Sequence, residues 1–152
     1  MKPKYPNSPT MIGFFLIPQF SMLSMSAAVE PLRIANRLSN SILYEWSFYS
    51  KHCLPVRASN GVEVAATRDI KDTDDLDALI VVAGIDVENH NDPALSRWLR
   101  RLSRSSTTLG STSTGSLLLA RAKLLQHSFS ALFTGQNLAT LLIAYPALKT
   151  PL

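Results

Sequence analysis

Short apolar runs that alternate with helical patterns constrain the fold of this chain more than any other feature. The runs MIGFFLIP at 11–18 and ALIVVA at 78–83 are apolar without alternation, which is typical of strands buried on both faces of a parallel sheet. Other segments space their apolar residues by three or four, as amphipathic helices do. The alternation predicts an α/β fold with a mainly parallel sheet and right-handed crossovers.

Local signals place the individual elements. Strands are expected at 11–18, 43–50, 78–83 and 107–112, and helices at 21–39, 92–106 and 114–125. Asn60-Gly61 between two valine-containing segments predicts a hairpin. Asp92 and Pro93 are a typical N-cap and first helical residue. Pro31 must either kink the first helix or lie near its start.

Size and composition restrict the chain to one ordinary domain. The 152 residues are 46% hydrophobic and carry a formal charge of +4, so a packed core is expected. Cys53 is the single cysteine, which excludes an intrachain disulfide and a cysteine-built metal cluster. Residues 1–10 are expected to form a flexible tail. The apolar run after them is too short for a membrane span and weak as a signal peptide, so a cytoplasmic location is expected.

The segment TTLGSTSTGSLLLA at 107–120 has the pattern of a strand that turns sharply into a helix. Small residues around Ser113 permit the strained elbow that presents a nucleophile in hydrolases. The hydrolase pattern G-x-S-x-G is not matched, because Ser111 stands at its first glycine. A serine also needs a base, and the histidines are His52, His90 and His127. His90 follows a central strand and is the best placed, although an exposed loop histidine is the commoner interpretation.

Other candidate sites are weaker. No glycine-rich phosphate loop is present, and the acidic segment DIKDTDDLD lacks the spacing of a calcium loop, so neither a cofactor nor a metal is expected. The helix predicted at 92–106 carries a basic stripe, formed by Arg97, Arg100, Arg101 and Arg104. Such a stripe can meet phosphates, but more often it is the solvent-facing side of a helix. No helix-turn-helix pair can be located.

Four segments together resemble a known family: IGFFLIPQFSMLSMSAAVEPLRIAN, PVRASNGVEV, LDALIVVAGIDV and LGSTSTGSLLLARAKLL. They are similar to the PfpI-like, class I glutamine-amidotransferase-like N-terminal domain of GlxA-type AraC-family transcriptional regulators, and most to regulators of choline, glycine betaine or carnitine catabolism. The resemblance implies a flavodoxin-like three-layer sandwich. Enzymatic relatives hold a cysteine at the elbow, an acid from the first helix and a histidine. Here Ser113, Ser24 and the Phe133-Thr134 pair stand at those positions, which implies a domain without catalytic residues.

The resemblance also bears on the limits of the chain. Such regulators continue with further strands and then a two-motif helix-turn-helix domain. Residues 11–152 are therefore expected to form an incomplete, C-terminally truncated PfpI-like domain that lacks its last strands and any DNA-binding domain. DNA contact is expected only through the helix-turn-helix domain that this chain lacks. The open sheet edge favours a homodimer.

The leading expectation is a non-enzymatic ligand-sensing domain of a transcriptional regulator. Its ligand-binding residues are expected to be Glu30, Gly84, Ile85, Asp86, Ser113 and Thr114. The resemblance suggests glycine betaine, carnitine or choline as ligand. Aromatic faces can hold a trimethylammonium group, yet core packing is the default role of Tyr44, Trp46, Phe48 and Tyr49. A small serine hydrolase or amidase that uses Ser113 and a pure dimerisation domain remain the alternatives.

Overall fold

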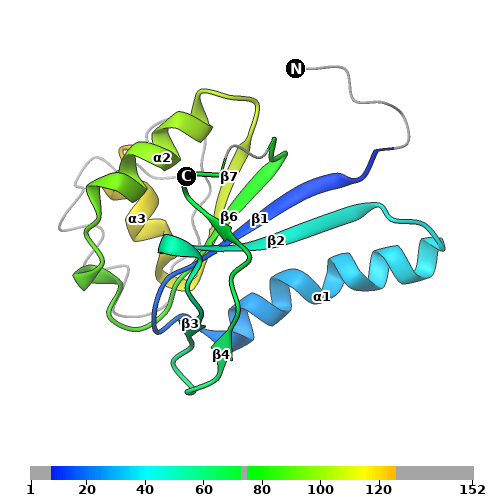
Figure 1. The fold of residues 1–152 in the computed structure, drawn as a ribbon, viewed down its shortest axis with the longest axis horizontal. Coiled ribbons are helices and arrows are strands. Elements are labelled where there is room, and N and C mark those ends of the chain that lie inside the picture. The colour runs from blue at the N-terminus through cyan, green and yellow to red at the C-terminus, as the bar shows by residue number, and fades with distance from the viewer. Residues whose placement is uncertain (1–7, 73–74, 126–152) are drawn as a thin grey trace, which may run out of the picture.

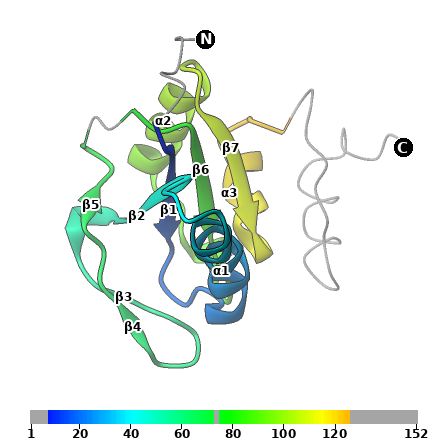
Figure 2. The same ribbon diagram turned by 90° about the vertical axis from the view of Figure 1, so that its right-hand side faces the viewer.

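A five-stranded parallel sheet is the centre of the computed structural model, which describes residues 8–72 and 75–125. Its strands are β1 (Thr10–Leu16), β2 (Tyr44–Ser50), β5 (Arg68–Asp69), β6 (Ala78–Val82) and β7 (Thr108–Thr112). They lie side by side in the order β5-β2-β1-β6-β7, and every adjacent pair is parallel (Figure 2). The predicted α/β fold with a mainly parallel sheet is therefore confirmed.

Helix α1 (Met22–Ser39) covers one face of the sheet (Figure 1). Ser21 caps its start by accepting a hydrogen bond from the Ser24 amide at 3.2 Å. Met25 packs from this helix against Phe14 and Phe20, both fully buried. The short hairpin of β3 (Val56–Arg57) and β4 (Glu63–Val64) closes the same core cluster through Val56.

Helices α2 (Pro93–Ser103) and α3 (Ser116–Arg121) lie on the opposite face (Figure 1). Trp98 of α2 packs against Phe15 and Tyr49, with ring centroids 5.5 and 5.7 Å away. This cluster contains the larger share of the buried apolar side chains. The two helical faces and the sheet between them make the expected three-layer sandwich.

Several local predictions are confirmed. Gly61 has a φ of +90° at the tip of the predicted hairpin, a conformation that glycine adopts without cost. Asp92 caps α2 by accepting from the Ala94 amide at 2.8 Å, and Pro93 is its first residue. The aromatic side chains of β2 serve the core as expected: Tyr49 is buried on the α2 face, while Phe48 lies 5.9 Å from Phe14 on the α1 face.

Other local predictions need refinement. Of the two placements predicted for Pro31, the structure shows the one inside the helix, in α1. The expected helix at 114–125 is shorter, because a 3₁₀ turn, η3 (Ser113–Gly115), precedes α3. Strand β5 was not predicted, since two residues at a sheet edge carry no periodic signal.

The carboxyl ends of β1 and β6 meet where the chain leaves the sheet toward opposite faces, α1 on one side and α2 on the other. Ligands of open α/β sheets bind at such a switch point. The two loops are tied here: the Ser21 amide donates to the Ala83 carbonyl, and the Ile85 amide donates to the Gln19 carbonyl, both at 3.1 Å. Phe20 between them is fully buried. The crevice is thus a closed seam, flanked by the elbow after β7.

Candidate functional site

The predicted elbow is present between β7 and α3. Strand β7 ends at Thr112, and Ser113 turns the chain with a φ of 52°. This left-handed conformation is uncommon for any residue other than glycine and often marks a functional position. Ser113 is exposed, so its hydroxyl lies at the surface beside the carboxyl ends of the strands.

Close backbone approach explains the small residues around the elbow. A side chain added at Gly115 would place its Cβ 2.5 Å from the Val81 carbonyl oxygen, and one at Gly84 would place it 2.3 Å from that of Gln19. Both distances are shorter than any tolerable contact. The Thr114 hydroxyl donates a 2.6 Å hydrogen bond to the Gly84 carbonyl. The structure therefore brings Gly84 and Thr114 together, with Thr114 buried rather than open to a ligand.

The turn after Gly84 presents two further predicted residues to solvent. Ile85 is 61% exposed. Asp86 is exposed, has a φ of 61° and precedes the 3₁₀ helix η2 (Val87–Asn89). Together with Ser113, these side chains flank the seam from the side of β6 and β7.

Glu30 makes its described contacts with Arg33 and not with the residues of the elbow. It is exposed in the middle of α1, where both Nε and Nη2 of Arg33 donate to one of its carboxylate oxygens, at 2.8 and 2.6 Å. This hydrogen bonding lowers the pKa of the Glu30 carboxyl from its ordinary value. An exposed pair one helical turn apart is mainly a surface interaction. No described contact joins Glu30 to Ser113, and its role in binding stays a prediction.

A base for Ser113 is missing among the described residues. No hydrogen bond within residues 8–72 and 75–125 joins the Ser113 hydroxyl to a histidine. His52 lies beside Asp69, with Nδ1 3.9 Å from its carboxylate. His90 lines a different pocket, described below. Ser24 stands in the first turn of α1, while His127, Phe133 and Thr134 lie outside the described residues.

The described part of the chain also offers no metal centre. Within it, no group of three His, Cys, Asp or Glu side chains gathers around one point. The acidic segment at 69–77 uses its carboxylates for the backbone instead: Asp72 accepts from the Asp69 amide and Asp77 from the Met11 amide, at 2.8 and 2.7 Å. These contacts are partly buried, so the described part of the segment is tied to the sheet and is not a freely solvated loop.

A pocket of about 680 Å³ was missed by the sequence analysis. It lies at the carboxyl ends of β1 and β2, with an apolar floor that includes Phe15 and Leu95 and a rim that includes His90. Lys51 and Asp92 form an ion pair of 2.8 Å at this rim. Hydrogen bonding by Lys51 is the main cause of the lowered pKa of the Asp92 carboxyl. The pocket joins loops that are distant in sequence, so no local sequence pattern predicted it.

Comparisons with known proteins identify the relatives of this chain. It is 45% identical over 112 residues to the HTH-type transcriptional regulator CdhR of Pseudomonas aeruginosa, and 33% identical over 117 residues to the HTH-type transcriptional regulator GlxA of Rhizobium meliloti. A solved AraC family transcriptional regulator from Pseudomonas putida shares its fold with a TM-score of 0.81 and 26% identity, covering 91% of this chain and 74% of that one. The chain is a homologue of GlxA-type, AraC-family transcriptional regulators.

The homology covers a defined share of each protein. The alignments include 74% and 76% of this chain, but only 33% of CdhR and 36% of GlxA, so the chain spans about a third of the curated relatives. No family model matches it.

Solved structures with lower identity show the fold alone. A THiJ/PfpI family protein from Pseudomonas syringae superposes with a TM-score of 0.61 at 20% identity, covering 83% of this chain and 54% of that one. This shared fold agrees with the PfpI-like resemblance, and the homology described above confirms the relation to GlxA-type regulators. Among the described helices, none has the length and apolarity that crossing a membrane requires.

Proposed function

We propose that this chain is a non-enzymatic, ligand-sensing domain of an AraC-type transcriptional regulator. Its homology to HTH-type regulators supports the regulatory role. The observation that carries the rest is the elbow: Ser113 keeps the strained, exposed geometry of a nucleophile but has no described base. A serine hydroxyl without a base is a poor nucleophile, whereas an exposed polar turn at the strand ends is a suitable ligand contact.

The sensed molecule is a small metabolite that lies against Ser113, Ile85 and Asp86. Gly84 and Thr114 support this surface through the hydrogen bond that joins them. Glycine betaine, carnitine and choline are the candidate ligands, on the strength of the family resemblance. The Asp86 carboxylate supplies a negative charge for their quaternary ammonium group.

Calorimetric titration of the chain with these three compounds tests the proposal. We expect at least one of them to release or absorb heat, and Ser113→Trp to abolish the signal by covering the elbow. Ser106→Trp adds the same bulk at an exposed serine beyond α2 and should leave binding unchanged. A folded sample that binds none of the three compounds contradicts this ligand assignment. Binding that survives Ser113→Trp contradicts the placement at the elbow.

A second candidate function rests on one observation, the left-handed φ of 52° at Ser113. This conformation is typical of the nucleophile in hydrolase elbows, so a small Ser-dependent hydrolase or amidase is the rival. Hydrolysis of activated esters that disappears in Ser113→Ala would establish it.

Dimerisation and a cytoplasmic location belong to the same proposal. β7 is an edge strand of the described sheet, and such an edge favours pairing with a second copy. Sedimentation equilibrium would measure the association directly, and a monomer at all concentrations would exclude the dimer.

A further inference from the structure

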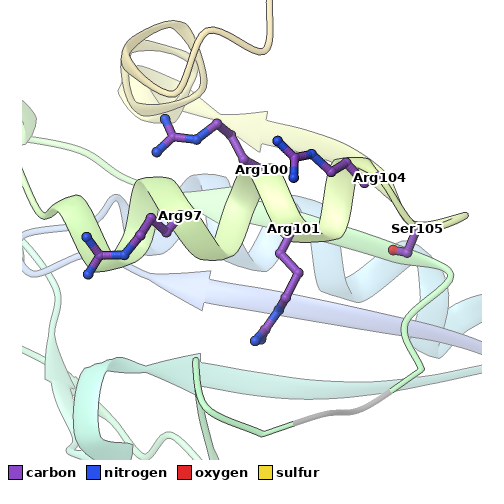
Figure 3. A pocket seen from close by; sticks show the side chains of 5 residues that line it. All are labelled: Arg97, Arg100, Arg101, Arg104 and Ser105. Atoms are coloured by element: carbon purple, nitrogen blue, oxygen red, sulfur yellow. The ribbon is translucent and has the colours of Figure 1, made fainter.

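Four arginines lie on α2 and at its C-cap and are here called the arginine stripe: Arg97, Arg100, Arg101 and Arg104 (Figure 3). Their spacing of three and four residues puts them on neighbouring rows of one helix surface. Together with Ser105 they line a shallow pocket of about 440 Å³. All but the half-buried Arg100 are exposed.

The described residues leave this charge without a carboxylate partner. Among the described residues, Glu30 pairs with Arg33, Asp92 with Lys51 and Asp69 with His52, and none of these ion pairs includes the arginine stripe. Arg101 alone bonds across to another segment, donating from Nη2 to the Ile70 carbonyl at 3.4 Å. Of the residues outside the described part, 1–7 and 126–152 contain no Asp or Glu, and Asp74 is the one that carries a side-chain carboxylate.

The attraction of cations to the carboxyl end of a helix explains only part of the arginine stripe. The carboxyl end of a helix attracts cations, which explains positive charge at Arg101 and at the C-cap, Arg104. Arg97 lies about two turns earlier, where this effect has faded. All four positions are arginine rather than lysine. The planar guanidinium donates two parallel hydrogen bonds to a phosphate, which an ammonium does not.

We propose that the arginine stripe binds the phosphate backbone of duplex DNA without reading its sequence. From Arg97 to Arg104 the helix advances about 10 Å, the axial length of about three phosphates on one strand. Arg101 borders the acidic segment at 69–77 through its bond to Ile70. The negative charge of this segment repels phosphate. The backbone therefore follows Arg97, Arg100 and Arg104.

DNA is favoured over an acidic protein as the partner by the relatives of this chain. They are HTH-type regulators of which it spans about a third, so in the proposed regulator the domain works close to bound DNA. A domain tethered to bound DNA meets that DNA at a high effective concentration, so even a few weak phosphate contacts contribute to binding. The inference rests on the proposed function for this proximity, and it adds a DNA contact to the one expected from a helix-turn-helix domain.

Fluorescence anisotropy with a labelled 20-base-pair duplex of scrambled sequence, measured from 25 to 200 mM NaCl, tests the inference. The variant is Arg97→Gln/Arg100→Gln/Arg104→Gln in the full 152-residue chain. The control, Arg37→Gln/Arg57→Gln/Lys71→Gln, removes the same charge from exposed residues of α1, of β3 and of the turn after β5. Circular dichroism verifies that both variants fold. We expect the stripe variant to reduce the slope of log K against log[NaCl] by about 2.7, since each phosphate contact contributes about 0.9.

Each outcome decides between the explanations. The inference is supported if the slope of log K against log[NaCl] falls in the stripe variant and changes by no more than about 0.9, the value of one phosphate contact, in the control. Equal losses in both variants, or no duplex binding at 25 mM NaCl, overturn it. Stripe-dependent binding of poly-L-glutamate without duplex binding also overturns it and assigns an acidic protein instead. The calorimetric titrations are independent of the stripe, so metabolite binding without DNA binding rejects this inference alone.

Discussion

The Thr114 hydroxyl and the Gly84 carbonyl are joined by a 2.6 Å hydrogen bond that ties the elbow to the turn after β6. Thr114→Val keeps the shape of the side chain and leaves the carbonyl without this donor. We expect a loss of about 1–2 kcal/mol in the free energy of unfolding, measured with urea. Thr114→Ser retains the hydroxyl and should lose clearly less. Equal losses in the two variants would show that packing, not the hydrogen bond, matters here.

Gly84 and Gly110 form a matched pair for testing close packing. Gly84→Ala forces its Cβ to 2.3 Å from a backbone oxygen, and we expect destabilisation of about 3 kcal/mol. Gly110→Ala in β7 meets nothing closer than 3.8 Å. It should be neutral or stabilise by up to about 1 kcal/mol, because glycine weakens a strand. Thermal unfolding of both variants makes the comparison, and similar melting temperatures would contradict the geometry.

Ser113 should be chemically inert but conformationally strained. A fluorophosphonate probe is expected to leave it unlabelled, because no described base activates it. Ser113→Gly should be more stable than Ser113→Ala by about 1 kcal/mol, since only glycine adopts a φ of 52° without cost. Stoichiometric labelling that Ser113→Ala removes would contradict the non-enzymatic function. Equal stability of the two variants would contradict the strain.

The Lys51–Asp92 pair predicts a specific pH dependence. The pKa of the Asp92 carboxyl is lowered in the folded state, mainly by Lys51, so its stabilisation is present above the unfolded pKa of about 3.9. It is lost as the pH falls through the folded pKa. Asp92→Asn retains the helix cap but not the charge.

Urea unfolding of the wild type and Asp92→Asn from pH 7 to pH 2 measures this effect. The difference in their free energies of unfolding should shrink below about pH 4 and vanish at the acid end. Lys51→Met should weaken the same pH dependence. A difference that is constant with pH would show that the ion pair does not contribute.

Sequence-specific DNA binding is not expected of this chain. One arginine stripe supplies contacts to phosphates, which carry no base information. Anisotropy at physiological salt should therefore give the same weak affinity for promoter and scrambled duplexes. A promoter fragment bound at least tenfold more tightly would require a base-reading element in this chain.

The centre of the sheet was predictable because β1 and β6 are continuous apolar runs, and the elbow because small residues lie between a strand and a leucine-rich segment. Both signals are local. The pocket beside Lys51 and Asp92 was not predictable, since it joins the end of β1 to loops that are distant in the chain. The contact of Glu30 with Arg33, through one carboxylate oxygen, was not predicted either, and its role in binding stays a prediction.

Phe20 joins three loops at the strand ends. It forms backbone bridges to Ala58 and to Gly84, and its carbonyl accepts from the Ser59 amide at 2.9 Å. Loop amides usually exchange their hydrogens quickly, because local opening exposes them to water. The amides of Ser21, Ser59 and Ile85 instead donate to carbonyls across this seam. They should exchange with deuterium together, as one cooperative unit as slow as the strands themselves.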